Sequence, residues 1–200
     1  GWGALVLALP VVLGPARWLW LLPVLLVALL PVLLATLPGV PAPIQAPLRE
    51  LVPQSIWGRL NDFNSQGVRP DALTRLSLWS MAIQLIAERP WRGWGAQHFG
   101  AIYQQRAGYT INHPHNIALD LAVSHGLPVA LALVAVVLWL LLRAAQRGMA
   151  ADRLFERAWW AAALVLVVLH ATDIPMYDSR LNIAGWVLLA GLRCRIQARA

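Results

Sequence analysis

A long apolar run from residue 116 to residue 142, NIALDLAVSHGLPVALALVAVVLWLLL, constrains this chain more than any other feature. A helix needs about 20 mostly apolar residues to cross the hydrocarbon core of a bilayer, and this run is longer than that. Residues 18–40 form a second such run despite Pro23 and Pro31, which membrane helices tolerate. The sequence therefore predicts an all-α protein with more than one membrane-spanning helix.

Further apolar segments are shorter. Residues 158–171 and 181–192 make sense as a membrane hairpin whose polar turn, residues 172–180, lies near one interface. Residues 1–14 look like the end of a span that began earlier, because the chain starts at Gly1 inside an apolar run. The composition agrees, since 59% of the 200 residues are hydrophobic and 12% are charged, which is too apolar for a soluble domain. We interpret the chain as a fragment of a polytopic helical membrane protein.

The arginines indicate how the chain is oriented, because cytoplasmic loops of membrane proteins carry an excess of basic residues. Arginine accounts for all 16 cationic residues. Four arginines lie in 143–157, three lie in the tail after 192, and Arg17 precedes the run at 18–40. Alternating spans place these three regions on one side, which we expect to be the cytoplasm. The predicted order is membrane segments over 1–38, an outer loop over 39–115, a membrane helix over 116–142, a cytoplasmic loop over 143–157, a membrane hairpin over 158–192 and a cytoplasmic tail over 193–200.

Charge and cysteine content exclude some classes of function. The net charge is +7, but the arginines stand singly between apolar runs, so topology explains them better than a nucleic-acid partner does. Cys194 is the single cysteine, which excludes an intrachain disulfide and a cysteine-cluster metal site.

The outer loop begins with the proline-rich stretch LPGVPAPIQAPL, which we expect to be an extended linker. An amphipathic helix is predicted over 71–88, with Asp71 as its N-cap and Pro90 as its stop signal. Its apolar stripe comprises Leu76, Trp79, Ile83 and Ile86, and its polar stripe comprises Thr74, Ser77, Gln84 and Glu88.

The sequence His113-Pro114-His115-Asn116 opens the long apolar run at its outer end. Asn116 is a good N-cap, and the positive end of the helix dipole favours an anion and a neutral imidazole. A neutral histidine beside an anion site is suited to act as a general base. The residues alone equally allow His115 and Asn116 to serve only as a helix cap. A metal site is a third interpretation, in which Asp120, His98 or Asp173 would join the two histidines.

Three other residues are candidates. His170 and Asp173 are spaced three apart at the outer end of a span, where ionisable groups are functional suspects by default. A hydrogen bond that anchors the hairpin explains them as well. Arg75 is one of several arginines in the outer loop, and a solvated charge is the simpler interpretation of it.

The order of these motifs resembles the O-antigen ligase and polymerase superfamily of polytopic membrane glycosyltransferases, which includes O-linked protein oligosaccharyltransferases. It runs from Arg75 and Trp79 through RPWRGWGAQHF to HPHN and a long apolar helix containing GLP. The ligase pattern of His-Asn, nine residues and Gly matches His115, Asn116 and Gly126, whereas Val129 departs from it. The resemblance covers roughly residues 70–190.

The resemblance implies roles for particular residues. His115 would be the essential histidine, and Arg75 would contact the pyrophosphate of a lipid-linked donor. We group His113, Asn116, His170 and Asp173 with them as substrate-binding candidates. A second family arginine would fall just before Gly1, so the fragment would lack part of the active site.

The expected function is transfer of a glycan from a polyprenyl-pyrophosphate donor to an acceptor hydroxyl, with inversion and without metal or cofactor. The site would face the periplasm or cell exterior from the bacterial cytoplasmic (inner) membrane. The partners would be the lipid-linked donor, membrane lipids and an acceptor that is a glycolipid, a glycan or a protein, with no nucleic acid. Alternatives are an O-antigen polymerase, a protein O-oligosaccharyltransferase and, from another class, a transporter or channel segment. The last is disfavoured because 129–142 has no polar residue.

Overall fold

The computed structural model describes residues 8–9, 11–14, 22–37, 39–53, 56–57, 73–151 and 153–198. Within these ranges the chain forms helices and no strand, which confirms the predicted all-α class. The principal helices are α3 (Leu22–Thr36), α4 (Ala42–Leu51), α6 (Arg75–Glu88), α7 (His98–Ala107), α8 (Ile117–His125), α9 (Leu127–Gln146), α10 (Leu154–Leu169), the 3-10 helix η4 (Pro175–Tyr177) and α11 (Ser179–Ala198).

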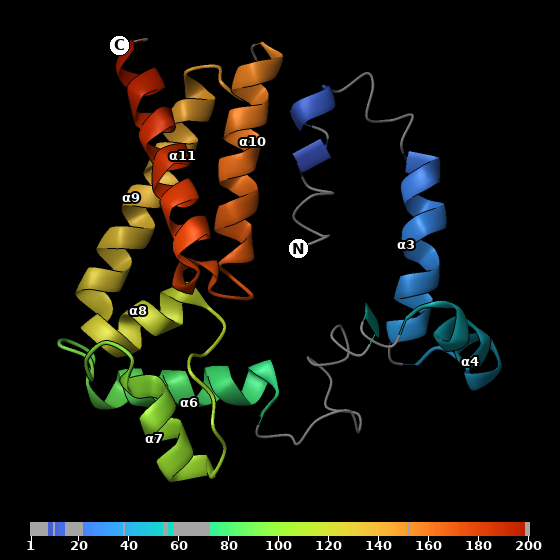
Figure 1. Cartoon of the computed structure of the whole chain (residues 1–200), viewed down its shortest axis with the longest axis horizontal. Helices are drawn as coiled ribbons and strands as arrows, with labels where there is room; N and C mark the ends of the chain where they lie inside the picture. Colours follow the sequence, from blue (N-terminus) through green and yellow to red (C-terminus); the bar gives the residue numbers. More distant parts are fainter. Residues whose placement is uncertain are drawn as a thin grey trace.

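Helices α9, α10 and α11 lie side by side and form a bundle (Figure 1). Tryptophan side chains hold the three helices together. Trp159 Nε1 on α10 donates to the carbonyl of Leu188 on α11 at 3.0 Å, and Trp160 Nε1 donates to the carbonyl of Leu141 on α9 at 2.9 Å. Helices α10 and α11 form a helical hairpin that extends beyond 158–192 at both ends, and its place in a membrane stays a prediction.

One described helix, α9, is long and apolar enough to cross a membrane, with a mean hydropathy of 2.4 over its best window. Only 22% of that window is buried inside the protein, whereas a core helix of a soluble protein is mostly buried. Leu131, Val136 and Leu142 are all more than half exposed. An apolar surface of this kind requires lipid or another apolar surface to cover it.

A second layer, formed by α6, α7 and α8, lies across one end of the bundle (Figure 1). Its core is built from Leu78, Ala82 and Leu85 of α6, which pack with Phe99 and Tyr103 of α7 and with Val123 of α8. The connection between α10 and α11 lies at the same end of the bundle, while the α9–α10 connection and the C-terminus lie at the other end (Figure 1). This layer and the connection between α10 and α11 carry the chain segments that form the candidate site.

The prediction of one helix over 116–142 was wrong, because the helix breaks at Gly126 into α8 and α9. The turn after α6 reaches into the break. The Leu127 N–H donates to the carbonyl of Pro90 at 2.7 Å, and the Trp94 N–H donates to the carbonyl of Val123 at 2.7 Å. Gly126 has φ +85°, and a Cβ there would lie 2.4 Å from the Trp91 carbonyl oxygen. The tryptophan-rich turn at residues 90–94 therefore packs directly against the backbone at Gly126, and we call this contact the joint at Gly126.

The predicted amphipathic helix is present as α6, but its start and its buried face differ from the prediction. It begins at Arg75 with Thr74 as the N-cap, whose side chain accepts from the Ser77 N–H; Asp71 lies outside the described residues. Leu76 and Ile83, two members of the predicted apolar stripe, are 55% and 59% exposed. The helix carries apolar residues on more than one side, so helical spacing alone did not identify the face that packs against α8.

The proline-rich stretch is not an extended linker over its whole length, because residues Ala42–Leu51 form helix α4. Pro43 stands in the first turn, where the missing N–H would have no partner in any helix. Arg49 Nε donates to the carbonyl of Ala35 at 3.0 Å, and this bond joins α4 to the end of α3.

Candidate functional site

The segment from His113 to Asn116 is held between α6 and the connection from α10 to α11. Trp79 Nε1 on α6 donates to the carbonyl of Pro114 at 2.9 Å. On the other side, the Ile117 N–H donates to the carbonyl of His170 at 2.9 Å. Segments that are far apart in the sequence therefore fix the backbone on both sides of His115.

Asn116 is the N-cap of α8, as predicted, with φ −155° and ψ 117°. Its Oδ1 accepts from the Leu119 N–H at 3.1 Å, and its Nδ2 donates to the carbonyl of Ala171 at 3.0 Å. Both ends of the amide are used within the protein, so Asn116 joins the start of α8 to the end of α10 as well as capping a helix.

His115 and Asp173 form the central pair of the site. His115 Nδ1 lies 3.0 Å from Asp173 Oδ1, which also accepts from the Ile174 N–H at 2.9 Å. Burial alone would raise the pKa of Asp173, but these two hydrogen bonds and the neighbouring imidazoles bring its pKa below the ordinary value. An ionised Asp173 favours the tautomer with the proton on Nδ1, which leaves Nε2 of a neutral His115 able to accept a proton.

The backbone at His115 is in the left-handed region, with φ +53°. Such a conformation in a residue other than glycine costs on the order of 1–3 kcal/mol and persists only where the surroundings impose it. Here the flanking hydrogen bonds to Pro114 and Ile117 impose it. Strain of this kind is frequent at active sites, and here it occurs at the residue whose ring contacts Asp173.

His113 packs against the other side of His115. The two rings meet edge to face with centroids 4.5 Å apart, and the His113 ring stacks on Tyr177 at 5.1 Å. Burial lowers the pKa of His113, the charge of His115 lowers it further, and Asp173 opposes the change. The His115 N–H donates to His113 Nδ1 at 3.4 Å. His113 is therefore a neutral neighbour that limits the positions open to His115.

Arg75, at the start of α6, reaches the same connection as Asp173. Its Nε donates to the carbonyl of Thr172 at 3.0 Å, on the peptide next to Asp173. The fold thus brings Arg75 and His115 to one loop although they stand on different segments. A guanidinium and an imidazole that contact neighbouring residues of one loop are an arrangement suited to an anionic substrate.

His170 and Asp173 do not form the shared helical face that their spacing suggests. Helix α10 ends at Leu169, and His170 Nδ1 donates back to the carbonyl of Leu166 at 2.7 Å. Asp173 points instead to His115. The helical face expected from their spacing is absent, because the helix ends before both residues.

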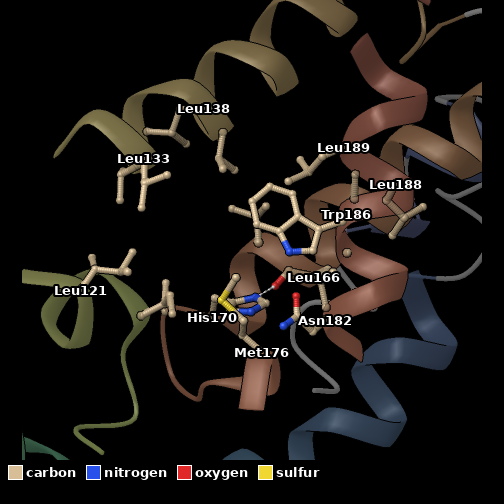
Figure 2. Close-up of a pocket in the computed structure, with 18 of the residues that line it drawn as sticks. Leu121, Leu133, Leu138, Leu166, His170, Met176, Asn182, Trp186, Leu188 and Leu189 are labelled. Atoms are coloured by element: carbon tan, nitrogen blue, oxygen red, sulfur yellow. Dashed lines mark hydrogen bonds between the residues drawn. The ribbon is translucent and has the colours of Figure 1, made fainter. Parts of the chain in front are cut away.

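An apolar pocket of about 310 Å³ opens between α8, α9, α10 and α11. Most of its lining is aliphatic, and Leu121, Leu133 and Leu138 face Leu188 and Leu189 across it (Figure 2). Its polar lining residues are Asn116, His170 and Asn182. Asn116 follows His115 in the chain, so the polar end of the pocket adjoins the histidine site.

The geometry also bears on the metal interpretation. Of the three residues considered as a third ligand, Asp173 is the one that the fold brings to the histidines, and one ligand atom from each of the three side chains lies within 4.8 Å of the others. His98 Nδ1 contacts its own turn at the carbonyl of Ala96, and Asp120 accepts from Tyr177. Two imidazoles and one carboxylate are a donor set that a transition metal accepts.

Sequence reasoning did not identify Tyr177 as part of the site. It lies in the polar turn of the hairpin, and nothing in its neighbours on the chain indicates that its ring meets His113. The PMY triplet that forms η4 gave no signal, because a stacking partner 64 positions away is set by tertiary structure.

These features define an all-helical protein, over the described residues, with one helix apolar enough to cross a membrane and a histidine–aspartate pair at one end of the bundle. The sequence pattern of the O-antigen ligase family matches residues 1–134, and the chain belongs to this family. The matched residues include Arg75, the His113–Asn116 segment and Gly126, and they end before Asp173. No curated protein and no solved structure matches the chain. Family membership implies a bacterial membrane enzyme of the ligase or glycosyltransferase type that acts on lipid-linked glycans.

Proposed function

We propose that this chain carries the catalytic histidine of a membrane glycosyltransferase. The enzyme moves a glycan from a polyprenyl-pyrophosphate donor to an acceptor hydroxyl at the outer face of the bacterial cytoplasmic membrane. The observation that carries the proposal is the 3.0 Å pair of His115 and Asp173 next to Arg75. It supplies a base, a carboxylate that orients the base, and a cation for the leaving group.

The reaction follows from this arrangement. His115 Nε2 takes the proton of the acceptor hydroxyl while that oxygen attacks the anomeric carbon of the donor sugar. The bond from the anomeric carbon to the pyrophosphate oxygen breaks, and the lipid pyrophosphate leaves with the electron pair. A single displacement inverts the anomeric centre. A positioned general base contributes about 10² to 10⁴ in rate.

Arg75 would stabilise the negative charge that develops on the departing pyrophosphate. Arginine stays charged and presents a planar fork that binds phosphate oxygens through two hydrogen bonds. One well-placed donor of this kind contributes about 3–4 kcal/mol to the transition state of acyl transfer. The carbonyl of Thr172 supports the proposal because it holds one nitrogen of Arg75 and so restricts the guanidinium.

The apolar pocket beside the site suits a lipid-linked donor. Such a donor has a long hydrocarbon tail and a charged head, so it needs an apolar surface that ends at polar groups. The pocket ends at Asn116 and His170, close to the histidine pair, and Figure 2 places His170 and Asn182 together among leucine side chains. Burying hydrocarbon in such a space contributes about 25 cal/mol for each Å² removed from water.

We propose that the reaction needs no metal, because a lipid pyrophosphate is already a stable anion and arginine can neutralise it. The nearness of His113, His115 and Asp173 makes metal dependence a real alternative outcome. In the metal-free arrangement, Asp173 is occupied by the Nδ1–H of His115 and by the Ile174 N–H. Transfer that survives removal of divalent ions supports this arrangement, and ion-restored activity contradicts it.

The arrangement suits a lipid core, a growing glycan or a protein as the acceptor, since the base would activate a hydroxyl in each case. A transporter path is disfavoured, because the polar lining of the pocket is confined to the end near the site. The remaining length of α9 offers no polar side chain between Val129 and Leu142.

The deciding experiment uses the complete protein in membranes with a defined polyprenyl-pyrophosphate glycan and separate lipid, glycan and peptide acceptors. Transfer to one acceptor class is expected, and His115→Gln should lower its rate by about 10² or more with little change in donor binding. Asn112→Gln, in the exposed loop before the site, is the matched control. Near-normal transfer by folded His115→Gln would reduce the motif to a helix cap.

A further inference from the structure

Resting on the proposed function, we propose that Asp120 and Tyr177 are positioning residues that hold the two histidines in their working geometry. Neither touches the reacting atoms. Together they connect helix α8 to the ring of His113 and, through that ring, to His115. This connection is separate from the hydrogen bond that Asp173 makes.

The connection starts at a buried carboxylate. Asp120 stands on α8 one turn after Asn116 and is only 6% exposed. Its Oδ2 accepts from the Tyr177 hydroxyl at 3.0 Å. A buried carboxylate is costly unless it is hydrogen-bonded, so this contact fixes the position of the phenol relative to α8.

The Tyr177 ring in turn packs against His113, which contacts His115. It stacks on His113 at an angle of 16° with centroids 5.1 Å apart, and His113 meets His115 edge to face at 4.5 Å. Burial and the Asp120 carboxylate raise the pKa of Tyr177 to about 12. The phenol therefore remains a neutral donor under all working conditions.

Asp173 alone does not fix His115 firmly, because Asp173 is partly open to solvent. Asp173 holds one side of His115, yet its side chain is 58% exposed. The backbone of His115 has φ +53°, a conformation that persists only when its surroundings enforce it. A base displaced by about 1 Å can lose about 10² in rate. The stack of Tyr177 on His113 restrains the side of His115 that Asp173 does not hold.

The first test separates a positioning role from a charge role at Asp120. Asp120→Asn keeps an oxygen that can accept from Tyr177 but removes the charge, whereas Asp120→Ala removes the acceptor. In the complete protein, Asp120→Ala should lower kcat about tenfold or more, since misplacement of a base is costly, while KM for the donor stays unchanged. Asp120→Asn should restore most of the rate. Equal losses in both variants would overturn the proposal in favour of a charged role.

The second test asks whether the two residues act as a unit. Tyr177→Phe keeps the ring and loses the hydroxyl, and Tyr177→Leu loses both. Transfer should fall in the order wild type, Tyr177→Phe, Tyr177→Leu. The double variant Asp120→Ala with Tyr177→Phe should be no slower than the slower single variant. Independent, multiplying losses would overturn the connection.

A third measurement does not depend on transfer. Diethyl pyrocarbonate modifies accessible imidazoles, and peptide mapping reports His113 and His115 separately. Tyr177→Leu should raise the modification rate of His113 severalfold, with His98 as the internal control because it is exposed on α7. If the complete protein transfers no glycan but this rate rises, the proposed function fails and the positioning contact stands. An unchanged rate in a protein with a normal melting temperature would overturn the positioning contact.

Discussion

His115 and Asp173 stand 58 positions apart in the sequence, yet their Nδ1 and Oδ1 atoms lie 3.0 Å apart. The pair exists because two short connections, before α8 and after α10, meet at the same end of the bundle. Asn116 and Ile117 join those connections through the backbone carbonyls of Ala171 and His170. The carboxylate therefore meets the imidazole at a fixed junction, where it can hold the tautomer that a base requires.

Asp173→Asn is expected to lower the transfer rate by about 10² while the protein stays folded. The amide can no longer force the proton onto Nδ1, so the base atom Nε2 is often protonated instead. Asp178→Asn in the same connection is the control, because Asp178 caps the start of α11 and does not face the histidines. Donor-saturated initial rates of both variants measure the effect, and equal rates would show that His115 acts without an orienting carboxylate.

Arg75→Ala should abolish measurable transfer, and Arg75→Lys should recover little, because lysine lacks the fork that binds two phosphate oxygens. Arg92→Ala is the matched control, since Arg92 is an exposed arginine on the turn after α6. Donor affinity and kcat should be measured separately for each variant. Similar losses at Arg75 and Arg92 would point to a diffuse positive surface and not to a phosphate site.

Acid should destabilise the site through His113. Burial, followed by the His115 charge, holds the pKa of His113 below its ordinary value of 6.5. The unfolded chain therefore binds a proton at a higher pH than the folded chain does, so stability is present above 6.5 and is lost as pH falls below it. His113→Gln should remove part of that pH dependence. Melting temperatures in detergent from about pH 7.5 to 5.5 would measure it, and parallel curves for both proteins would contradict this assignment.

The local features of the fold and site were largely predictable from the sequence. Asn116 was recognised as a helix cap because its signal is carried by the residues beside it. The apolar helix α9 and the helical hairpin of α10 and α11 follow from composition, which needs no knowledge of neighbours, whereas the break before α9 does not. His115, His113 and Asp173 were singled out as residue types, and the resemblance to a family selected Arg75.

The joint at Gly126 and the Tyr177 stack could not be predicted, since both are made by segments far apart in the sequence. The sequence marks Gly126 only as part of the family pattern, whereas the structure shows the backbone of Trp91 lying against it. The prediction of the buried face of α6 was wrong for a related reason. The helix has apolar residues on several sides, and the packing against α8 determines which side is covered.

The proposed topology predicts which positions an impermeant thiol reagent can reach. Thr110 and Ala151 are exposed and belong to the loop before α8 and the loop between α9 and α10. With the exposed Cys194 replaced by serine, Thr110→Cys should be labelled in intact spheroplasts. Ala151→Cys should be labelled only after the membrane is opened. The reverse pattern would place the histidine site on the cytoplasmic side and contradict the proposed direction of transfer.

Gly126→Ala should destabilise the protein more than Gly108→Ala, although both glycines have a positive φ. A Cβ at Gly108 would meet nothing within 4 Å, while a Cβ at Gly126 would lie 2.4 Å from the Trp91 carbonyl oxygen. At Gly108, with φ +77° and ψ 7°, the left-handed backbone costs alanine about 1–2 kcal/mol. Gly126, with φ +85° and ψ 166°, lies in a backbone region that is essentially restricted to glycine, so alanine is strained there as well. The clash at Gly126 adds about 1–3 kcal/mol, as overpacking does in a well-packed interior.

Thermal unfolding of both variants in detergent compares a left-handed glycine in open space with a glycine that has both a glycine-specific backbone and a close neighbour. The loss at Gly126 should be accompanied by reduced transfer, since the joint between Trp91 and Gly126 places α8, and α8 begins beside His115. Equal melting temperatures for the two variants would mean that the turn after α6 does not lie against Gly126 in the membrane. In that case the glycine of the family pattern would be explained by its backbone angle alone.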